Sequence, residues 1–267
     1  MFVTRLISGI VLIIIALVTI ISGNNVLLTT TLILSLIGVF ELYRIADVQK
    51  KALGIAGYLA VIGYYLLLYF DLKDYIIMLA LGFLGIIMAI YVLTFPKYNS
   101  EQVMITFFGF FYVAVMLSYV YQVRMLLNGS ILVWLIFLCS WGCDTCSYCV
   151  GMLFGKHKMA PKLSPKKSVE GAIGGILGAA LLGAVYFAAM DHFFGIKGSS
   201  IMHFAIICGV GAIISQIGDL AASAIKRNHD IKDYGKLIPG HGGVLDRFDS
   251  VIFTAPCIYF LATMLLK

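Results

Sequence analysis

The sequence predicts an all-α membrane protein that crosses the bilayer about nine times. Of the 267 residues, 61% are hydrophobic and only 12% are charged, and the mean hydropathy is +1.01. Soluble domains carry about 45–50% apolar and about 25% charged residues, so this excess of apolar surface indicates lipid as the solvent. A β-barrel is disfavoured, because barrel strands alternate apolar and polar residues and this sequence runs continuously apolar.

Apolar runs of about 20 residues, the length that a spanning helix needs, recur between short polar breaks. The nine predicted helices cover residues 5–22, 26–45, 53–70, 75–95, 103–127, 130–153, 169–190, 201–224 and 249–266. The first run is interpreted as a retained helix and not as a removed signal peptide, because residues 20–24 make a poor cleavage site.

The positions of the basic residues predict which side each loop faces. With a cytoplasmic N-terminus and nine spans, the cytoplasmic segments hold 15 of the 19 Lys and Arg residues. The predicted outer segments hold Lys73, Arg124, Lys197 and Lys267. Cytoplasmic loops of membrane proteins are enriched in Lys and Arg, so we expect the N-terminus in the cytoplasm and the C-terminus outside.

Polar residues divide the chain unevenly. Residues 1–128 hold about five lipid-compatible helices with few intramembrane charges, whereas residues 129–267 hold two long cytoplasmic loops and most of the polar side chains. We expect one integrated membrane domain whose second part is catalytic.

Two carboxylates fall inside apolar runs. Asp144 lies in the sixth run and Asp219 in the eighth, each near the cytoplasmic end. An ionised Asp in hydrocarbon costs roughly 2.5–3.5 kcal/mol, so such residues usually face a wet cavity and have a function. The alternative is a structural Asp satisfied by a neighbouring hydroxyl group. Ser215 and Ser223 share the helix face of Asp219, because they lie four residues before and after it.

The loop after the sixth run is rich in lysine. It carries five Lys residues between positions 156 and 167, and Pro161 and Pro165 exclude a continuous helix. A phosphate would fit at the N-terminus of the helix that follows Ser168, where free amide groups and the helix dipole favour anions. The alternative is that these lysines only set the topology or contact anionic lipid headgroups.

The segment from Ser223 to Asp249 combines acidic, basic, histidine and glycine residues. Asp246 and Asp249 supply the hard oxygen donors that Mg²⁺ prefers, and the basic residues suit phosphate. Gly242 and Gly243 allow backbone amides to approach a ligand closely.

This segment resembles the signature of the phosphatidate cytidylyltransferase (CDP-diacylglycerol synthase) family. The matching residues are Ser223-x-Ile225-Lys226-Arg227, Lys232-Asp233, Pro239-x-His241-Gly242-Gly243 and Asp246-Arg247-x-Asp249. Upstream matches are Asp144-Thr145, Tyr148, Gly155-Lys156, Ser164-Pro165-Lys166-Lys167, Glu170-Gly171 and Gln216-x-Gly218-Asp219-Leu220. The resemblance covers residues 139–254; its one departure is Ser168, where relatives more often carry Thr.

The resemblance implies an enzyme that makes CDP-diacylglycerol and pyrophosphate from CTP and phosphatidic acid for phospholipid biosynthesis, using Mg²⁺ and a second cation, divalent or K⁺. It implies these catalytic residues: Asp219, Asp246, Lys226, Arg227 and His241. The implied substrate-binding residues are Ser164, Lys167, Ser223, Lys232, Asp233, Gly242, Gly243 and Arg247. The implied metal ligands are Asp144, Asp219, Asp246 and Asp249.

The same resemblance implies a homodimer in the cell inner membrane, with the active site facing the cytoplasm. There it meets CTP and phosphatidic acid of the cytoplasmic leaflet, and membrane lipids but no nucleic acid are its expected partners. One alternative is a related CTP-using membrane enzyme, either a lipid kinase or a cytidylyltransferase for another lipid phosphate. Another alternative is an ion-coupled transporter. The complete signature favours the cytidylyltransferase, and the crowding of the carboxylates on one side disfavours a transporter, whose sites lie near the midplane.

Two sets of small residues are interpreted as packing surfaces. Cys139, Cys143, Cys146 and Cys149 lie on one predicted helix, where inert buried thiols are favoured over a zinc site. Gly171, Gly174, Gly175, Gly178 and Gly183 form a stripe that predicts close helix packing, within the chain or at a dimer contact.

Overall fold

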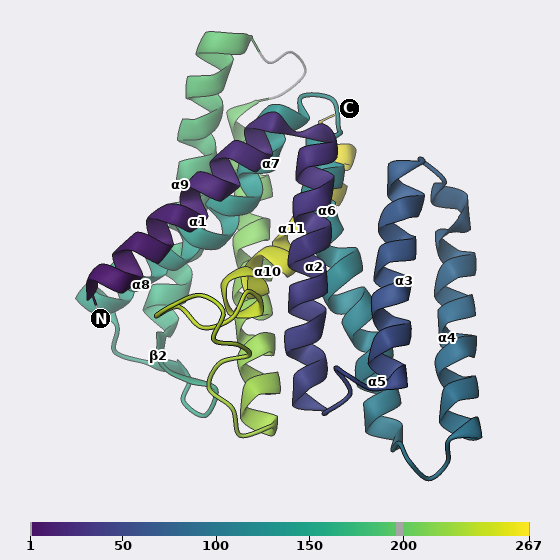
Figure 1. The fold of residues 1–267 in the computed structure, drawn as a ribbon. Helices are drawn as coiled ribbons and strands as arrows, with labels where there is room; N and C mark the ends of the chain where they lie inside the picture. The colour runs from purple at the N-terminus through teal and green to yellow at the C-terminus, as the bar shows by residue number, and fades with distance from the viewer. Residues whose placement is uncertain (1, 196–199, 267) are drawn as a thin grey trace. The chain divides into compact units, whose positions relative to one another are not determined.

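The computed structural model describes residues 2–195 and 200–266, without the side chains of residues 2–6. The N-terminal elements are α1 (Phe2–Ser22), α2 (Asn24–Ile45), α3 (Ala52–Tyr69), η1 (Lys73–Tyr75), α4 (Ile76–Leu93), α5 (Ser100–Gly109), η2 (Phe110–Val115) and α6 (Met116–Arg124). The remaining elements are α7 (Gly129–Phe137), η3 (Leu138–Gly142), α8 (Cys143–Phe154), β1 (Lys158–Ala160), β2 (Ser164–Ser168), α9 (Val169–Phe194), α10 (Ile201–Asn228) and α11 (Leu245–Leu265). Figure 1 shows their order along the chain.

The predicted class, an all-α polytopic membrane protein, is confirmed. Among the described residues, eight helices are long and apolar enough to cross a membrane, and α1 adds the shorter apolar helix Ile7–Ser22. Each of the nine predicted runs coincides with a helix or a continuous helical stretch to within a few residues at most ends. The sidedness of the loops stays a prediction; Lys197 and Lys267 are not among the described residues, and the side chain of Arg5 is not described.

Two runs predicted as plain helices contain a π-helical segment. The fifth run consists of α5, the π-helical η2 and α6, and the sixth consists of α7, the π-helical η3 and α8. Such single-turn π-helical segments frequently occur at functional sites. The second of them directly precedes the helix that carries Asp144.

The lysine-rich loop contains a small β-hairpin that the sequence did not predict. β1 and β2 pair antiparallel, with Lys158 opposite Ser168 and Ala160 opposite Ser164. Pro161 lies in the turn and Pro165 in β2, so the exclusion of a helix through both prolines is confirmed. The strand pairing escaped prediction because the Lys-Pro composition shows no alternation of apolar and polar residues.

Contacts within the chain divide it into two compact units. The first unit comprises residues 1–121 and 232–248, and the second comprises residues 122–231 and 249–267. The loop after α10 thus belongs to the same unit as the N-terminal helices. The predicted division into lipid-compatible helices up to residue 128 and a catalytic part from residue 129 is a division by function, and it stays a prediction.

The first unit is built around buried aromatic side chains of α2 and α3. The Tyr43 hydroxyl donates to the carbonyl oxygen of Thr106 at 2.6 Å, and the Tyr65 hydroxyl shares a 2.8 Å hydrogen bond with Ser35. Gly109 makes room for the Tyr43 ring, since a Cβ there would lie 2.7 Å from a ring carbon. These hydrogen bonds satisfy the buried hydroxyl groups, which would otherwise lack partners in an apolar core.

The second unit is organised by close packing of α9 against α8. A Cβ on Gly174 would lie 2.6 Å from Val150, and one on Gly178 would lie 2.6 Å from the Cys146 sulfur. The predicted glycine stripe is therefore a packing surface within the chain, which confirms the packing interpretation. The interpretation of the cysteines as buried thiols is confirmed for Cys139 and Cys143 and is wrong for Cys149, which is exposed; Cys146 is half-buried.

Candidate active site

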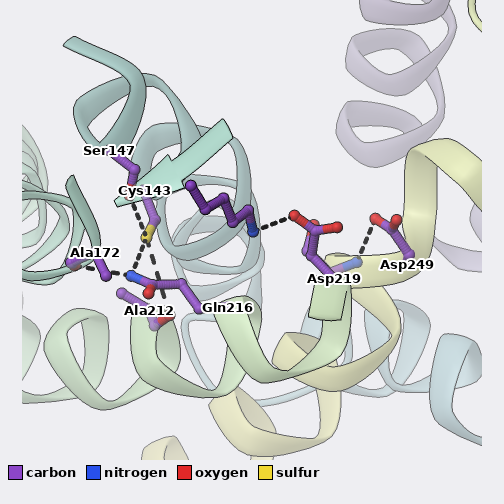
Figure 2. Close-up of polar contacts among 9 residues, drawn as sticks. Cys143, Ser147, Ala172, Ala212, Gln216, Asp219 and Asp249 are labelled. Carbon is purple, nitrogen blue, oxygen red and sulfur yellow. Dashed lines mark hydrogen bonds and ion pairs between the residues drawn. The ribbon is translucent and has the colours of Figure 1, made fainter. Parts of the chain in front are cut away.

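Three predicted metal ligands belong to the second unit, on three different helices. α8 carries Asp144, α10 carries Asp219 and α11 carries Asp249. Asp249 is only 9% exposed, and it interacts electrostatically with Asp219, Asp144 and Lys226. Figure 2 shows the side chains of Asp219 and Asp249 next to one another. Carboxylates gathered in this way repel one another, so the cluster favours a bound cation.

A lysine of the hairpin reaches this cluster. The Lys167 ammonium group, carried by β2, forms an ion pair with the Asp219 carboxylate, and both side chains are 26% exposed. Lys167 and Asp219 are 52 positions apart in the chain, so the hairpin is what brings the cation to α10. The sequence predicted Lys167 for substrate and Asp219 for metal; the structure places the two in direct contact.

Both residues line a cavity of about 510 Å³. Its walls come from α8, the hairpin, the start of α9 and α10, and they include Asp144 and Ser164. Lys166 and Lys167 supply positive charge, while Met152 and Met159 supply apolar surface. A cavity lined by both charged and apolar side chains suits an amphiphilic or multiply charged ligand.

Gln216 lines the same cavity and is held by the protein. Its Nε2 atom donates to the Ala172 carbonyl oxygen at 3.0 Å and to the Cys143 sulfur at 3.4 Å. Figure 2 shows these contacts. Ser168, which also lines the cavity, caps α9, because its hydroxyl accepts a hydrogen bond from the Gly171 amide at 3.1 Å. The predicted phosphate site at this helix N-terminus stays a prediction.

The base of the hairpin is held by a carboxylate. Glu170 accepts the backbone amides of Lys156 at 3.1 Å and His157 at 3.2 Å. The same carboxylate contacts the Nδ1 atom of the His157 ring at 2.6 Å. Glu170 thus ties the start of the hairpin to the first turn of α9.

The end of α10 holds three further predicted residues. Ser223, Lys226 and Arg227 occupy its last two turns, and Lys226 is the cation that interacts with Asp249. Arg227 donates to the Ile231 carbonyl oxygen at 3.2 Å. This bond fixes the backbone where the helix ends.

The remaining predicted residues lie in the first unit, in and beside the loop 232–244. Asp246 accepts the backbone amides of Tyr234 at 2.8 Å and Gly243 at 3.0 Å. Gly242 has a φ of 86°, which favours glycine. Lys232 and Asp233 are exposed on the loop. Asp246 therefore organises this loop, and its predicted role as a metal ligand stays a prediction.

His241 is held by contacts on two sides. Its Nδ1 atom shares a 2.8 Å hydrogen bond with the Ser8 hydroxyl of α1, and that hydroxyl also donates to the Pro239 carbonyl oxygen at 3.1 Å. The Nε atom of Arg247 donates to the His241 carbonyl oxygen at 2.9 Å. The conformation of His241 thus depends on a helix more than 200 positions away in the sequence.

The structure reveals site residues that the sequence analysis missed. Glu41 and Arg44 of α2 contact the loop 232–244, and Ser8 contacts His241. The signal for Glu41 was present, since it is a carboxylate inside a long apolar run. Arg44 and Ser8 carried no such signal, because a basic residue at a helix end and a lone serine are common in membrane helices.

The donor chemistry of the second unit fits Mg²⁺. Asp144, Asp219 and Asp249 offer only carboxylate oxygens, which Mg²⁺ prefers to nitrogen or sulfur ligands. Within residues 2–195 and 200–266, no three His, Cys, Asp or Glu side chains are already arranged as a metal site. Magnesium sites often use one or two carboxylates and complete their coordination with water and substrate phosphates.

The fold and these residues define a polytopic membrane enzyme whose second unit brings carboxylates and lysines together at a cavity. A family model described as the Cytidylyltransferase family matches residues 3–265. The chain belongs to this family, and the resemblance drawn from its motifs is confirmed.

Curated relatives named phosphatidate cytidylyltransferase are similar over most of the chain. The Rickettsia prowazekii (strain Madrid E) protein is 33% identical over 219 residues, which cover 80% of this chain and 92% of the relative. The Staphylococcus saprophyticus protein is 29% identical over 267 residues, covering 96% and 97%. The Staphylococcus aureus (strain COL) protein is 29% identical over 272 residues, with the same coverage. The similarity therefore includes the N-terminal helices as well as the signature.

Proposed function

We propose that this protein is a Mg²⁺-dependent phosphatidate cytidylyltransferase of the cell inner membrane. It transfers CMP from CTP to phosphatidic acid and yields CDP-diacylglycerol and pyrophosphate. The observation that carries the proposal is the cavity in which Lys167 pairs with Asp219 beside Asp249. Membership of the Cytidylyltransferase family supports the type of reaction, and the relatives' names support the lipid acceptor.

The reaction needs little acid–base catalysis. A phosphate monoester is largely dianionic near neutral pH, because its second pKa is about 6. A phosphate oxygen of phosphatidic acid attacks the α-phosphorus of CTP, and the bond from that phosphorus to the bridging oxygen of the β-phosphate breaks. The electron pair of that bond leaves with pyrophosphate. No proton has to be removed from the attacking oxygen, because it is already ionised.

The difficulty is electrostatic, since one anion must approach another. Lys167 and Lys166 at the cavity, with Lys226 beside Asp249, place fixed positive charge near the phosphates. When bound, Mg²⁺ would neutralise triphosphate charge and stabilise the leaving pyrophosphate. Asp219 and Asp249, with Asp144 nearby, would hold this ion; Asp246 as a further ligand and a second cation, divalent or K⁺, belong to the same proposal.

The proposal includes a place for the reaction. The predicted cytoplasmic bias of Lys and Arg residues puts both loops where CTP is found. A cavity with an apolar wall suits entry of the lipid from the cytoplasmic leaflet. A homodimer remains part of the proposal on family grounds alone.

A direct assay tests the proposed function. The purified full-length protein is incubated with labelled CTP, phosphatidic acid and Mg²⁺, and the lipid and phosphate products are separated. We expect CDP-diacylglycerol and pyrophosphate, with no product when EDTA replaces Mg²⁺. Phosphorylated lipid with released CDP would support a kinase instead, and absence of turnover would reopen the transporter interpretation.

The metal assignment has its own test. We expect Asp219→Asn to lower kcat at least about 100-fold, because a ligand of the metal and the partner of Lys167 are lost together. Asp191→Asn, an exposed residue near the end of α9, is the matched control and should retain activity. Near-normal activity of Asp219→Asn would refute the role of Asp219 in metal binding.

A further inference from the structure

Glu41 is a buried carboxylate in the middle of the first unit. It lies in α2, near the end of an apolar helix, and is only 4% exposed. Burying an ionised carboxylate is costly unless hydrogen bonds compensate for the lost water. Its partners therefore indicate why a charge occupies this position.

Those partners are the backbone amides of the last loop residue and of the first residue of α11. The Val244 amide donates to Oε1 of Glu41 at 3.1 Å, and the Leu245 amide donates to Oε2 at 2.9 Å. The amides at a helix start have no partner within the helix, and the helix dipole favours a negative charge there. Glu41 thus caps α11 from a different helix, about 200 positions earlier in the chain.

The loop 232–244 is folded tightly around this carboxylate. A Cβ on Gly235 would lie 2.7 Å from the carboxyl carbon of Glu41, and one on Gly243 would lie 2.5 Å from it. Both distances are far below van der Waals contact. The two glycines lie next to one another, since a Cβ on Gly235 would also lie 2.8 Å from the Cα atom of Gly243. Without side chains, they let the loop backbone lie directly against the Glu41 carboxylate.

Two other side chains complete the frame. Arg44, one helical turn after Glu41, donates to the Tyr234 carbonyl oxygen. Asp246 accepts the amides of Tyr234 and Gly243 from the side of α11. The loop is thus held by α2 on one side and by α11 on the other, with Glu41 bonded directly to the point where loop and helix join.

We propose that Glu41 is a positioning residue for the CTP phosphates, acting through the loop 232–244 and the start of α11. It sets the conformation of Gly242, Gly243 and Arg247, which the family resemblance implies as substrate-binding residues, and whose backbone amides and guanidinium group suit phosphate. The kinetic part of this inference rests on the proposed function. Glu41 itself does not touch substrate in this role, because both of its oxygens are bonded to backbone amides.

The primary test is Glu41→Gln, which keeps the volume but replaces one acceptor oxygen with a donor that faces a backbone amide. Glu101→Gln is the matched control, since Glu101 lies in the same unit and is exposed. Hydrogen–deuterium exchange of the full-length protein is measured for both. We expect faster exchange in residues 234–246 of Glu41→Gln, with residues 156–168 unchanged and the control like the wild type.

Kinetics separate positioning from a purely structural role. Loss of a hydrogen bond to a charged group predicts a rise of about tenfold or more in KM for CTP, with KM for phosphatidic acid changing less than about twofold. Glu41→Asp keeps the charge and should lie between the wild type and Glu41→Gln. If Glu41→Gln does not fold, the same measurements are made on Glu41→Asp and compared with the wild type.

Three outcomes decide the inference. Exchange and KM for CTP at wild-type values in Glu41→Gln overturn it, and so does faster exchange with an unchanged KM for CTP. A wild-type protein that makes no CDP-diacylglycerol overturns the proposed function instead. In that case, faster loop exchange in Glu41→Gln still supports the positioning of the loop.

Discussion

The two polar loops are held in place by the same kind of bond in opposite surroundings. At the base of the hairpin loop, residues 155–168, the half-exposed Glu170 accepts the amides of Lys156 and His157. At the loop 232–244, the buried Glu41 accepts the amides of Val244 and Leu245. A carboxylate–amide bond is stronger where water cannot compete. We therefore expect the hairpin to adjust to a ligand more readily than the loop 232–244.

The hairpin has a second attachment, because Lys167 reaches Asp219 through an ion pair between two side chains. The loop 232–244 is held mainly through backbone atoms, and also through the hydrogen bond between the His241 ring and the Ser8 hydroxyl. A ligand phosphate can take the place of Asp219 as the partner of Lys167, because both are anions. We therefore expect ligand binding to exchange the partner of Lys167 in the hairpin, and to leave the backbone hydrogen bonds of the loop 232–244 in place.

The largest expected effect comes from removing that exchangeable contact. Lys167→Met should lower kcat/KM about 100-fold, because the cation that faces both Asp219 and the phosphates is lost. Lys162→Met, an exposed lysine in the turn of the same hairpin, is the control and should lose less than about threefold. Equal effects of the two substitutions would mean that the hairpin contributes only general positive charge.

A stability measurement tests how firmly the loop 232–244 is packed against Glu41. Gly235→Ala forces a methyl group against the buried Glu41 carboxylate, and overpacking of this kind costs typically about 1–3 kcal/mol. Thermal unfolding of the full-length protein in detergent should therefore begin at a lower temperature. Gly82→Ala is the control, because no atom lies within 4 Å of a Cβ there. A Gly235→Ala protein as stable as that control would show that the loop yields easily.

The smallest expected effect belongs to the base of the hairpin. Glu170→Gln removes the charge that the Lys156 and His157 amides contact, but the site is open to water. We expect kcat/KM to fall by less than about fivefold, as for other exposed ion pairs, with faster deuterium exchange confined to residues 156–158. A loss as large as that for Lys167→Met would reverse the ranking of the two hairpin attachments.

The sequence predicted the helices well because their cause is local. A run of about 20 apolar residues has few options other than a spanning helix, so all nine runs appear as helical stretches. The hairpin and the π-helical segments were not predicted. The strand pairing of Lys158 with Ser168 and the π-helical hydrogen bonds of Leu138–Gly142 depend on contacts with neighbouring segments. The spacing of apolar residues in the sequence carries no information about such contacts.

The site was predicted in its residues and not in its contacts. Residue chemistry identified Asp219 and Lys167, but their pairing joins residues 52 positions apart. Glu41 was missed for the same reason: its role appears only when α2 lies against the start of α11 in the first unit. Motifs indicate which residues a family uses, whereas the partner that holds each one comes from the tertiary structure.

The glycine stripe of α9 has a consequence for motion. If α9 moved one helical turn along α8 in one direction, Ala179 would take the place of Gly175, where Ser147 leaves no room for a methyl group. A move of the same length in the other direction would put Glu170 in the place of Gly174, against Val150. Either shift would bring a larger side chain into a close contact, so the observed register is favoured over the two registers that differ from it by one helical turn. The α8–α9 pair is therefore a suitable reference for distance measurements. A change in distance between a probe on this pair and a probe on the hairpin would report movement of the hairpin and not sliding of α9.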